Sequence, residues 1–228
     1  MRIAVIADLH AGAPFIDEDK VRRVVAMTNN AHPDMILLAG DYVITHVLGG
    51  RHMPIETIAE LLRPLAAPLG VHAVLGNHDR WESAPHIAAV LRRAGIDVLD
   101  NAATIIATHQ GKLYLVGIGD YFTHGADPGR ALALLPRGER ALCLTHSPDV
   151  FPELDARCRL TIAGHTHGGQ VDLPWFGRLI VPSRYAQRYA AGLRREGPKY
   201  LFTSTGIGTS IVPLRFRVPP EISLLTIR

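Results

Sequence analysis

Six short apolar runs, each ending in glycine or a polar residue, constrain the fold of this 228-residue chain most strongly. They span residues 3–10, 35–41, 71–79, 113–120, 141–147 and 160–169. Near-continuous apolar runs of this length predict buried strands, as in sheets whose outer faces are covered by helices. Because ligands of open α/β sheets bind beyond the carboxyl ends of strands, we expect the polar residues that end these runs to meet on one rim.

Helical patterns lie between several of the predicted strands. They are expected at about 17–31, 54–65, 83–94 and 127–135. Asp17 and Ser83 are expected to cap two of these helices, because their side-chain oxygens can accept the free N–H groups of a first turn. Three later apolar runs follow without intervening helices, at 178–181, 200–204 and 222–227. This order favours a second, more antiparallel sheet, so the sequence predicts an α/β fold of two stacked sheets flanked by helices.

Size and composition agree with one domain covering residues 1–228. Apolar residues make up 47% of the chain, enough for a sizeable core, and no linker-like block or repeat divides it. The formal net charge of +3 does not imply a nucleic-acid partner. The first residues, MRIAVIADLH, lack the basic region and long apolar stretch of a signal peptide, so we expect a cytoplasmic protein.

The two cysteines, Cys143 and Cys158, lie in or beside apolar runs. Two thiols in a chain without a secretory signal favour a reducing compartment over a disulfide. We therefore expect two small buried side chains that are not joined to each other.

Two of the polar clusters place a pair of metal-binding side chains two residues apart. Asp8 and His10 end the first run, and His165 and His167 end the last. In extended backbone, residues i and i+2 project to the same side, so each pair could contribute to one metal site.

The other clusters offer single ligands and a candidate acid. Asp41 follows a glycine, and its two carboxylate oxygens could bridge two cations. Asn77 offers a neutral amide oxygen and His146 an imidazole nitrogen. His78 is placed to act on a substrate, and Asp79 to orient the ring of His78 and raise its pKa.

The ordered set DxH, GD, GNHD, TH and GHTHGG, over residues 8–170, resembles the calcineurin-like metallophosphoesterases. Each motif alone occurs by chance in many chains, but the complete ordered set is specific. Residues 182–192 and 204–216 further resemble a bacterial phosphodiesterase subgroup that includes enzymes similar to those acting on lipid-linked substrates. The resemblance implies a four-layer αββα sandwich of metallophosphoesterase type.

The resemblance also implies a binuclear metal centre that contains every ligand of the family pattern. One metal is assigned to Asp8, His10, Asp41 and His167, and the other to Asp41, Asn77, His146 and His165. Asp41 bridges the two, and a hydroxide shared by the metals is the nucleophile. A ligand set of nitrogen and oxygen without thiolate suits Mn²⁺ first, with an Fe/Zn pair or Co as alternatives.

Four further residues are candidates for substrate binding. Asp120 and His124 follow a predicted strand end and could face the same rim. Arg184 and Arg188 belong to a basic segment, 178–199, that contains a single acid and could receive a phosphate or an anionic lipid surface.

The predicted activity is therefore hydrolysis of a phosphate mono- or diester by a metal-dependent enzyme. An alternative is pyrophosphate cleavage in a nucleotide-sugar lipid such as UDP-2,3-diacylglucosamine. A third interpretation, a binding module of the same fold without turnover, is disfavoured because a scaffold has no need of His78 beside complete metal ligands. Peripheral contact with the inner face of a membrane is a further expectation.

Overall fold

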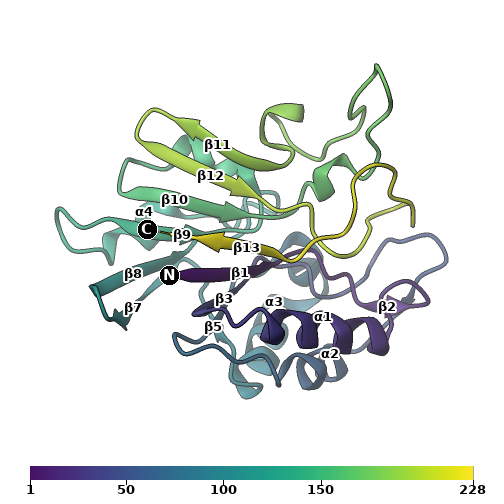
Figure 1. The fold of residues 1–228 in the computed structure, drawn as a ribbon, viewed down its shortest axis with the longest axis horizontal. Coiled ribbons are helices and arrows are strands. Elements are labelled where there is room, and N and C mark those ends of the chain that lie inside the picture. Colours follow the sequence, from purple (N-terminus) through teal and green to yellow (C-terminus); the bar gives the residue numbers. More distant parts are fainter. Residues whose placement is uncertain (228) are drawn as a thin grey trace.

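The structure, a computed structural model, describes residues 1–227 as two mixed β-sheets stacked face to face, with helices on the outer faces (Figure 1). This arrangement confirms the predicted αββα sandwich. The first sheet has the order β13-β1-β3-β5-β6 and the second the order β11-β12-β10-β9-β8-β7. Both sheets have four parallel strands with antiparallel strands only at their edges.

The strands of the first sheet are β1 (Arg2–Ile6), β3 (Met35–Leu38), β5 (Val71–Ala73), β6 (Asp97–Val98) and β13 (Ser223–Thr226). Those of the second are β7 (Ala102–Thr108), β8 (Gly111–Gly117), β9 (Ala141–Leu144), β10 (Cys158–Ala163), β11 (Gly192–Glu196) and β12 (Lys199–Thr203). Two short strands, β2 (Gly12–Ala13) and β4 (Arg51–His52), pair with each other.

The α-helices are α1 (Glu18–Asn30), α2 (Ile55–Leu62), α3 (Asn77–Arg93) and α4 (Pro128–Ala133). Three 3-10 helices follow, η1 (Pro148–Glu153), η2 (His167–Gly169) and η3 (Ala186–Tyr189). Asp17 caps α1 as predicted, because its side chain accepts from the backbone N–H of Lys20 at 2.9 Å. In α3 the backbone leaves helical geometry at Ser83, so the predicted helix from residue 83 corresponds to the second part of α3.

Three apolar clusters correspond to the three interfaces of the sandwich. One lies between the first sheet and α1, α2 and α3 and contains Ile36, Ile58 and Leu91. The second lies between the sheets, where Val5 and Leu37 join Leu142 of the second sheet. The third covers the outer face of the second sheet under α4 and η1. Burial on both faces explains why the strands read as uninterrupted apolar runs.

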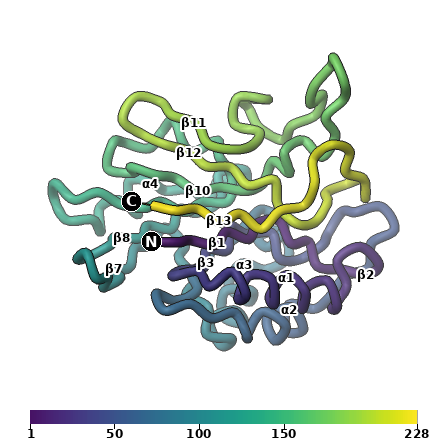
Figure 2. The backbone as a smooth tube through the Cα atoms, in the orientation of Figure 1, coloured from purple at the N-terminus to yellow at the C-terminus, as the bar shows by residue number. Residues whose placement is uncertain are grey.

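Two of the later strand predictions are wrong in detail. Residues 178–181 form no strand, and Leu179 and Ile180 are both exposed instead of alternating across a sheet. The run at 222–227 forms β13, but it pairs with β1 of the first sheet and not with the second sheet. The backbone trace shows this C-terminal strand beside the N-terminal one (Figure 2). The second sheet is still the more antiparallel of the two, as expected, because it has two antiparallel pairings and the first sheet has one.

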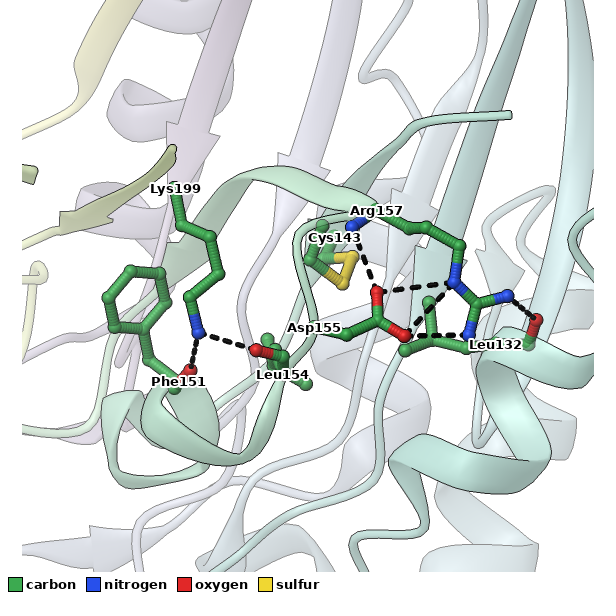
Figure 3. Close-up of a disulfide and its surroundings, with 8 residues drawn as sticks. Leu132, Cys143, Phe151, Leu154, Asp155, Arg157 and Lys199 are labelled. Atoms are coloured by element: carbon green, nitrogen blue, oxygen red, sulfur yellow. Dashed lines mark hydrogen bonds and ion pairs between the residues drawn. A yellow bond between two sulfur atoms is a disulfide. The ribbon is translucent and has the colours of Figure 1, made fainter. Parts of the chain in front are cut away.

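The prediction of two separate thiols is also wrong. Cys143 and Cys158 are buried, as expected, but they form a disulfide between the neighbouring strands β9 and β10 (Figure 3). Parallel pairing brings their Cα atoms to 5.6 Å, within the range that a disulfide spans. Because the two cysteines are not free thiols, they no longer favour a reducing compartment.

Within residues 1–227, none of the helices combines the length and the apolar character that a membrane crossing requires.

Candidate metal centre

The loops that leave β1, β3, β5, β9 and β10 meet at one end of the sandwich and bring the predicted ligands together. The seven predicted ligands are Asp8, His10, Asp41, Asn77, His146, His165 and His167, and all are buried. Their convergence follows from the parallel strands, whose carboxyl ends lie at the same edge of each sheet.

Two clusters of possible ligand atoms share no residue, and a third group, formed by His10, Asp41 and His78, overlaps both. Ligand atoms of Asp8, His10 and His167 lie within 4.8 Å of one another. In this first cluster, Nε2 of His10 is 3.1 Å from Nε2 of His167. First-sheet and second-sheet residues therefore share one site.

Ligand atoms of Asp41, His146 and His165 form the second cluster, again within 4.8 Å of one another. Nε2 of His146 lies 3.1 Å from Oδ1 of Asn77 and 3.1 Å from Nδ1 of His165. The four residues thus point polar atoms at a common centre.

Asp41 connects the two clusters through one carboxylate oxygen. Its Oδ2 atom lies 3.4 Å from Nε2 of His10 and 3.3 Å from Nε2 of His146. Its Oδ1 atom accepts from the backbone N–H of His78 at 2.9 Å, which fixes the orientation of the carboxylate.

The hydrogen bonds of the histidine rings test whether a cation fits here. Nδ1 of His146 lies 2.7 Å from the carbonyl oxygen of Ala39, and Nδ1 of His10 lies 3.3 Å from that of Val43. A carbonyl only accepts, so each Nδ1 carries the proton and each Nε2 presents a lone pair to the site. Lone pairs that face one another and a carboxylate need a positive charge between them, and the residues therefore fit metal ions.

The electrostatics of His146 agree with a cation at this position. Burial lowers the pKa of His146, but the nearby Asp41 and Asp8 raise it to about 10, so the carboxylates stabilise positive charge here. The Nε2 atom of His165 is buried and has no hydrogen-bond partner among residues 1–227. The Nδ1 atom of His165 faces the second cluster, so Nδ1 is the ring nitrogen that presents a lone pair to the site and Nε2 carries the proton.

Backbone strain is concentrated on the proposed ligands. Five of them have a left-handed backbone, namely Asp8 (φ 51), His10 (φ 44), Asp41 (φ 57), His165 (φ 70) and His167 (φ 51). Such values are uncommon outside glycine and cluster at functional sites. Close packing holds them, because a Cβ on Gly76 would lie 2.1 Å from Oδ1 of Asp41.

The predicted role of Asp79 is wrong. Its carboxylate accepts from the backbone N–H groups of Gly76, Asp41, Tyr42 and Val43 at 2.8, 2.8, 2.9 and 3.4 Å, and it has no bond to the His78 ring. Asp79 therefore stabilises the loops that carry Asn77 and Asp41. Burial is also the main influence on His78 and lowers its pKa instead of raising it.

His78 is oriented by a residue that the sequence analysis missed. Its Nδ1 atom bonds to the hydroxyl of Thr45, while Nε2 faces Oδ2 of Asp41 at 3.9 Å. The ring also packs edge-on to His10, with centroids 4.6 Å apart. No motif singled out Thr45, since a threonine four residues after an aspartate carries no local signal.

A second missed residue supports the first cluster from behind. The guanidinium of Arg215 donates to the carbonyl oxygens of Thr205 and Gly208 and lies 3.4 Å from Nδ1 of His167. The loop after β12 is therefore tied to a proposed ligand.

The mouth of the site is lined by aromatic rings. Trp81 lies 4.8 Å from the His78 ring and Phe122 lies 5.3 Å from the His165 ring, measured between centroids. Both line an open pocket of about 490 Å³ together with Arg80. A substrate group entering here would contact these rings before it reached the metal ligands.

The four predicted substrate contacts have different environments. Asp120 is buried near the site, and its Oδ1 atom has no hydrogen-bond partner within the described part of the chain. His124 is exposed in the same loop. Arg184 donates to the hydroxyl of Tyr121 at 2.9 Å, whereas Arg188 forms an ion pair with Glu196 at 2.7 Å. The positive charge of Arg188 is therefore offset by the carboxylate of Glu196.

The fold and the site together define a class, α/β enzymes with a buried centre of histidine, carboxylate and amide ligands at the carboxyl ends of two stacked sheets. The sequence pattern of the calcineurin-like phosphoesterases matches residues 1–169, and the chain belongs to this family. It is a metal-dependent phosphoester hydrolase.

Known proteins of several kinds are similar to this chain. The phosphodiesterase YaeI of Escherichia coli is 36% identical over 229 residues, which cover 98% of this chain and 81% of that protein. The UDP-2,3-diacylglucosamine pyrophosphatase LpxG of Chlamydia trachomatis is 27% identical, covering 99% of this chain and 83% of that protein. The Haemophilus influenzae NAD nucleotidase structure shares the fold, with 14% identity, a TM-score of 0.58 and coverage of 90% of this chain and 45% of the other.

Proposed function

We propose that this chain hydrolyses phosphate diesters or monoesters with two divalent metal ions that share Asp41 and supply the attacking hydroxide. The observation that carries the proposal is the position of Asp41 Oδ2, 3.4 Å from a ligand nitrogen of the first cluster and 3.3 Å from one of the second. A carboxylate in this position can bridge two ions, which lie roughly 3.5–4 Å apart in two-metal hydrolases.

The ligands divide between the sheets, which supports one catalytic domain. Asp8, His10, Asp41 and Asn77 follow strands of the first sheet, and His146, His165 and His167 follow strands of the second. Each proposed metal set draws on both sheets, so neither sheet contains a complete site. We infer that residues 1–227 act as a single unit.

His78 is the proposed acid or transition-state stabiliser. It lies beside Asp41, and the Thr45 hydroxyl fixes its ring so that Nε2 faces the site. From there it can protonate the leaving oxygen or bond to a phosphoryl oxygen. Asp120, with one unpaired oxygen near the mouth, is a proposed substrate contact.

Mn²⁺ is the first choice of metal, with Fe/Zn or Co as alternatives, because the ligands are imidazole, carboxylate and amide. A cytoplasmic location is proposed from the sequence alone, and the disulfide Cys143–Cys158 does not support it.

Pyrophosphate cleavage in a nucleotide-sugar lipid is the second candidate. The similarity to LpxG over nearly the whole chain favours it. A lipid-linked substrate would also suit the exposed apolar side chains near the metal centre, such as Leu179 and Ile180.

A turnover screen tests these proposals. The Mn²⁺-loaded protein is assayed on bis(4-nitrophenyl) phosphate, 4-nitrophenyl phosphate, cyclic nucleotides and UDP-2,3-diacylglucosamine, with Asp41→Ala as the inactive control. Diester turnover that EDTA removes and Mn²⁺ restores supports the first candidate. A kcat/KM on the UDP-lipid at least about a hundredfold above that on every simple ester would support the second. No turnover of any substrate with any of the metals would reject both.

A further inference from the structure

An unusual number of large apolar side chains is exposed at the end of the molecule that contains the metal centre. We call this set the apolar end, and its members are Leu48, Trp175, Phe176, Leu179, Ile180, Ile211, Val212, Leu214 and Phe216. Trp175 is 98% exposed and Ile180 is 80% exposed. Soluble monomers rarely group so many apolar side chains at one site without a partner.

Three loops form the apolar end, and hydrogen bonds hold them together. The backbone N–H of Leu48 donates to the carbonyl of Ile211 at 2.9 Å, and that of Asp172 to the carbonyl of Phe216 at 3.0 Å. In Figure 1 the loop between β10 and β11 projects at the upper right, beside the loop between β12 and β13. The apolar end is therefore one connected surface.

Trp175 is presented by a defined turn. Leu173 and Gly177 exchange two backbone hydrogen bonds, of 2.9 and 2.8 Å, and close a small hairpin. Trp175 and Phe176 lie in the turn of that hairpin, and Trp175 has a left-handed backbone with φ 66. Such a turn holds two aromatic rings away from the core.

An apolar cavity connects this surface to the metal centre. Its volume is about 390 Å³, and Leu179, Ile180, Ile211 and Leu214 line it. The proposed metal ligand His167 lines the same cavity. A molecule that reaches the metals from this side therefore passes apolar side chains.

The charges around the apolar end are mostly positive. Apart from Arg215, whose guanidinium is bound to backbone carbonyls behind His167, the segments 171–184 and 209–217 contain Arg178, Arg184 and Arg217 but only one acid, Asp172. Asp172 lies 3.8 Å from Arg178, which offsets its charge. Exposed aromatic and aliphatic side chains flanked by arginines are typical of proteins that bind the surface of anionic membranes.

We propose that the apolar end docks on an anionic lipid bilayer, with Trp175 and Phe176 inserted among the headgroups and the exposed Arg184 and Arg217 at lipid phosphates. A second copy of this chain is a poorer occupant, because a two-fold interface would place the arginines of one copy against those of the other. This inference goes beyond the proposed activity, because docking requires neither bound metal nor turnover. It places the cavity beside His167 at the membrane surface.

Vesicle sedimentation tests the docking. The protein is mixed with vesicles of pure phosphatidylcholine or of phosphatidylcholine with 30% phosphatidylglycerol, and bound protein and tryptophan emission are measured. We expect binding to the anionic vesicles with a blue-shifted emission. Because the two aromatic side chains would bury the largest apolar area in the bilayer, the double variant Trp175→Ser, Phe176→Ser should bind at least about tenfold more weakly. Arg217→Gln should weaken binding about fivefold.

The matched control is Met27→Ser, Leu134→Ser, which removes two exposed apolar side chains from α1 and from the end of α4. It should bind vesicles as the wild type does. Thermal melting establishes that all variants are folded.

Three results would overturn the proposal. They are no binding of the wild type to anionic vesicles, equal binding of the Trp175→Ser, Phe176→Ser variant, or equal binding to neutral and anionic vesicles. A dimer in light scattering that this double variant dissociates would assign the surface to a second copy instead. Turnover of bis(4-nitrophenyl) phosphate by the same preparations, expected to be unchanged in the double variant, tests the proposed activity separately.

Discussion

His165 donates its backbone N–H to both carboxylate oxygens of Asp8, at 2.9 and 3.0 Å, across a sequence separation of 157 residues. Asp8 follows β1 in the first sheet and His165 follows β10 in the second. The pair therefore joins the two sheets at the proposed metal centre. Changes to the ligands are therefore expected to affect both metal content and stability.

Asp41→Ala should lose more metal than any other single substitution. It removes the only carboxylate positioned between the two ligand clusters among the described residues. Wild-type protein saturated with Mn²⁺ should contain two ions per chain by elemental analysis, and the variant fewer than one. Asp19→Ala, which removes an exposed carboxylate of α1, is the control and should keep two. At most one ion in saturated wild type would contradict the shared site.

His78→Ala should keep both metal ions and lose activity. Loss of a general acid typically costs ~10²- to 10⁴-fold in rate, and the cost rises with the pKa of the leaving group. We therefore expect kcat to fall further on alkyl esters than on nitrophenyl esters. An equal fall on both would instead assign His78 to the phosphoryl oxygens, and unchanged rates on both would remove it from the reaction.

Thr45→Val should lower kcat about three- to tenfold while KM and metal content stay the same. The substitution keeps the side-chain shape but removes the hydroxyl that bonds to Nδ1 of His78. One such hydrogen bond contributes roughly 0.5–1.5 kcal/mol. Thr45→Ser, which restores the hydroxyl, is the matched control and should recover most of the rate. Equal kcat values for the valine and serine variants would show that Thr45 does not position His78.

Asp79→Ala should destabilise the protein and deplete its metal, in contrast to His78→Ala. Its carboxylate accepts from four buried backbone N–H groups, and each one left unpaired costs roughly 1–3 kcal/mol. We expect a lower midpoint of thermal unfolding together with reduced metal content, and a smaller effect for Asp79→Asn, which keeps one oxygen. If Asp79→Ala melted at the wild-type temperature and kept two ions, Asp79 would not be structural and a catalytic role would be favoured.

Arg184→Ala and Arg188→Ala should differ in their effect on KM. The guanidinium of Arg184 reaches the Tyr121 hydroxyl, in the loop that also contains Phe122, whereas that of Arg188 is bound to Glu196. We expect Arg184→Ala to raise KM for large anionic substrates and to leave kcat on a small ester unchanged. Arg188→Ala should leave both values as in the wild type. Identical KM values for the two variants on every substrate would exclude a role in substrate preference.

Much of the first sheet could be predicted from local pattern because its core strands are short, apolar and buried on both faces. Residues 35–38 and 71–73 form β3 and β5 inside their predicted runs. β7, at residues 102–108, was missed, because its mixed burial gives neither an apolar run nor a clean alternation. The apolar run at 178–181 predicts a strand that does not form, because its apolar side chains Leu179 and Ile180 face solvent.

The sequence by itself determined the family, the order of the polar clusters and the residue types offered to metal, because each cluster is a local motif at the end of a buried strand. Only the tertiary structure decided how these residues act on one another. In that structure Asp79 accepts hydrogen bonds from four backbone amides and His78 bonds to Thr45. Cys143 is joined to Cys158, and the apolar end is exposed. These contacts join segments whose relative positions depend on sheet order and register, and no short stretch of sequence contains that information.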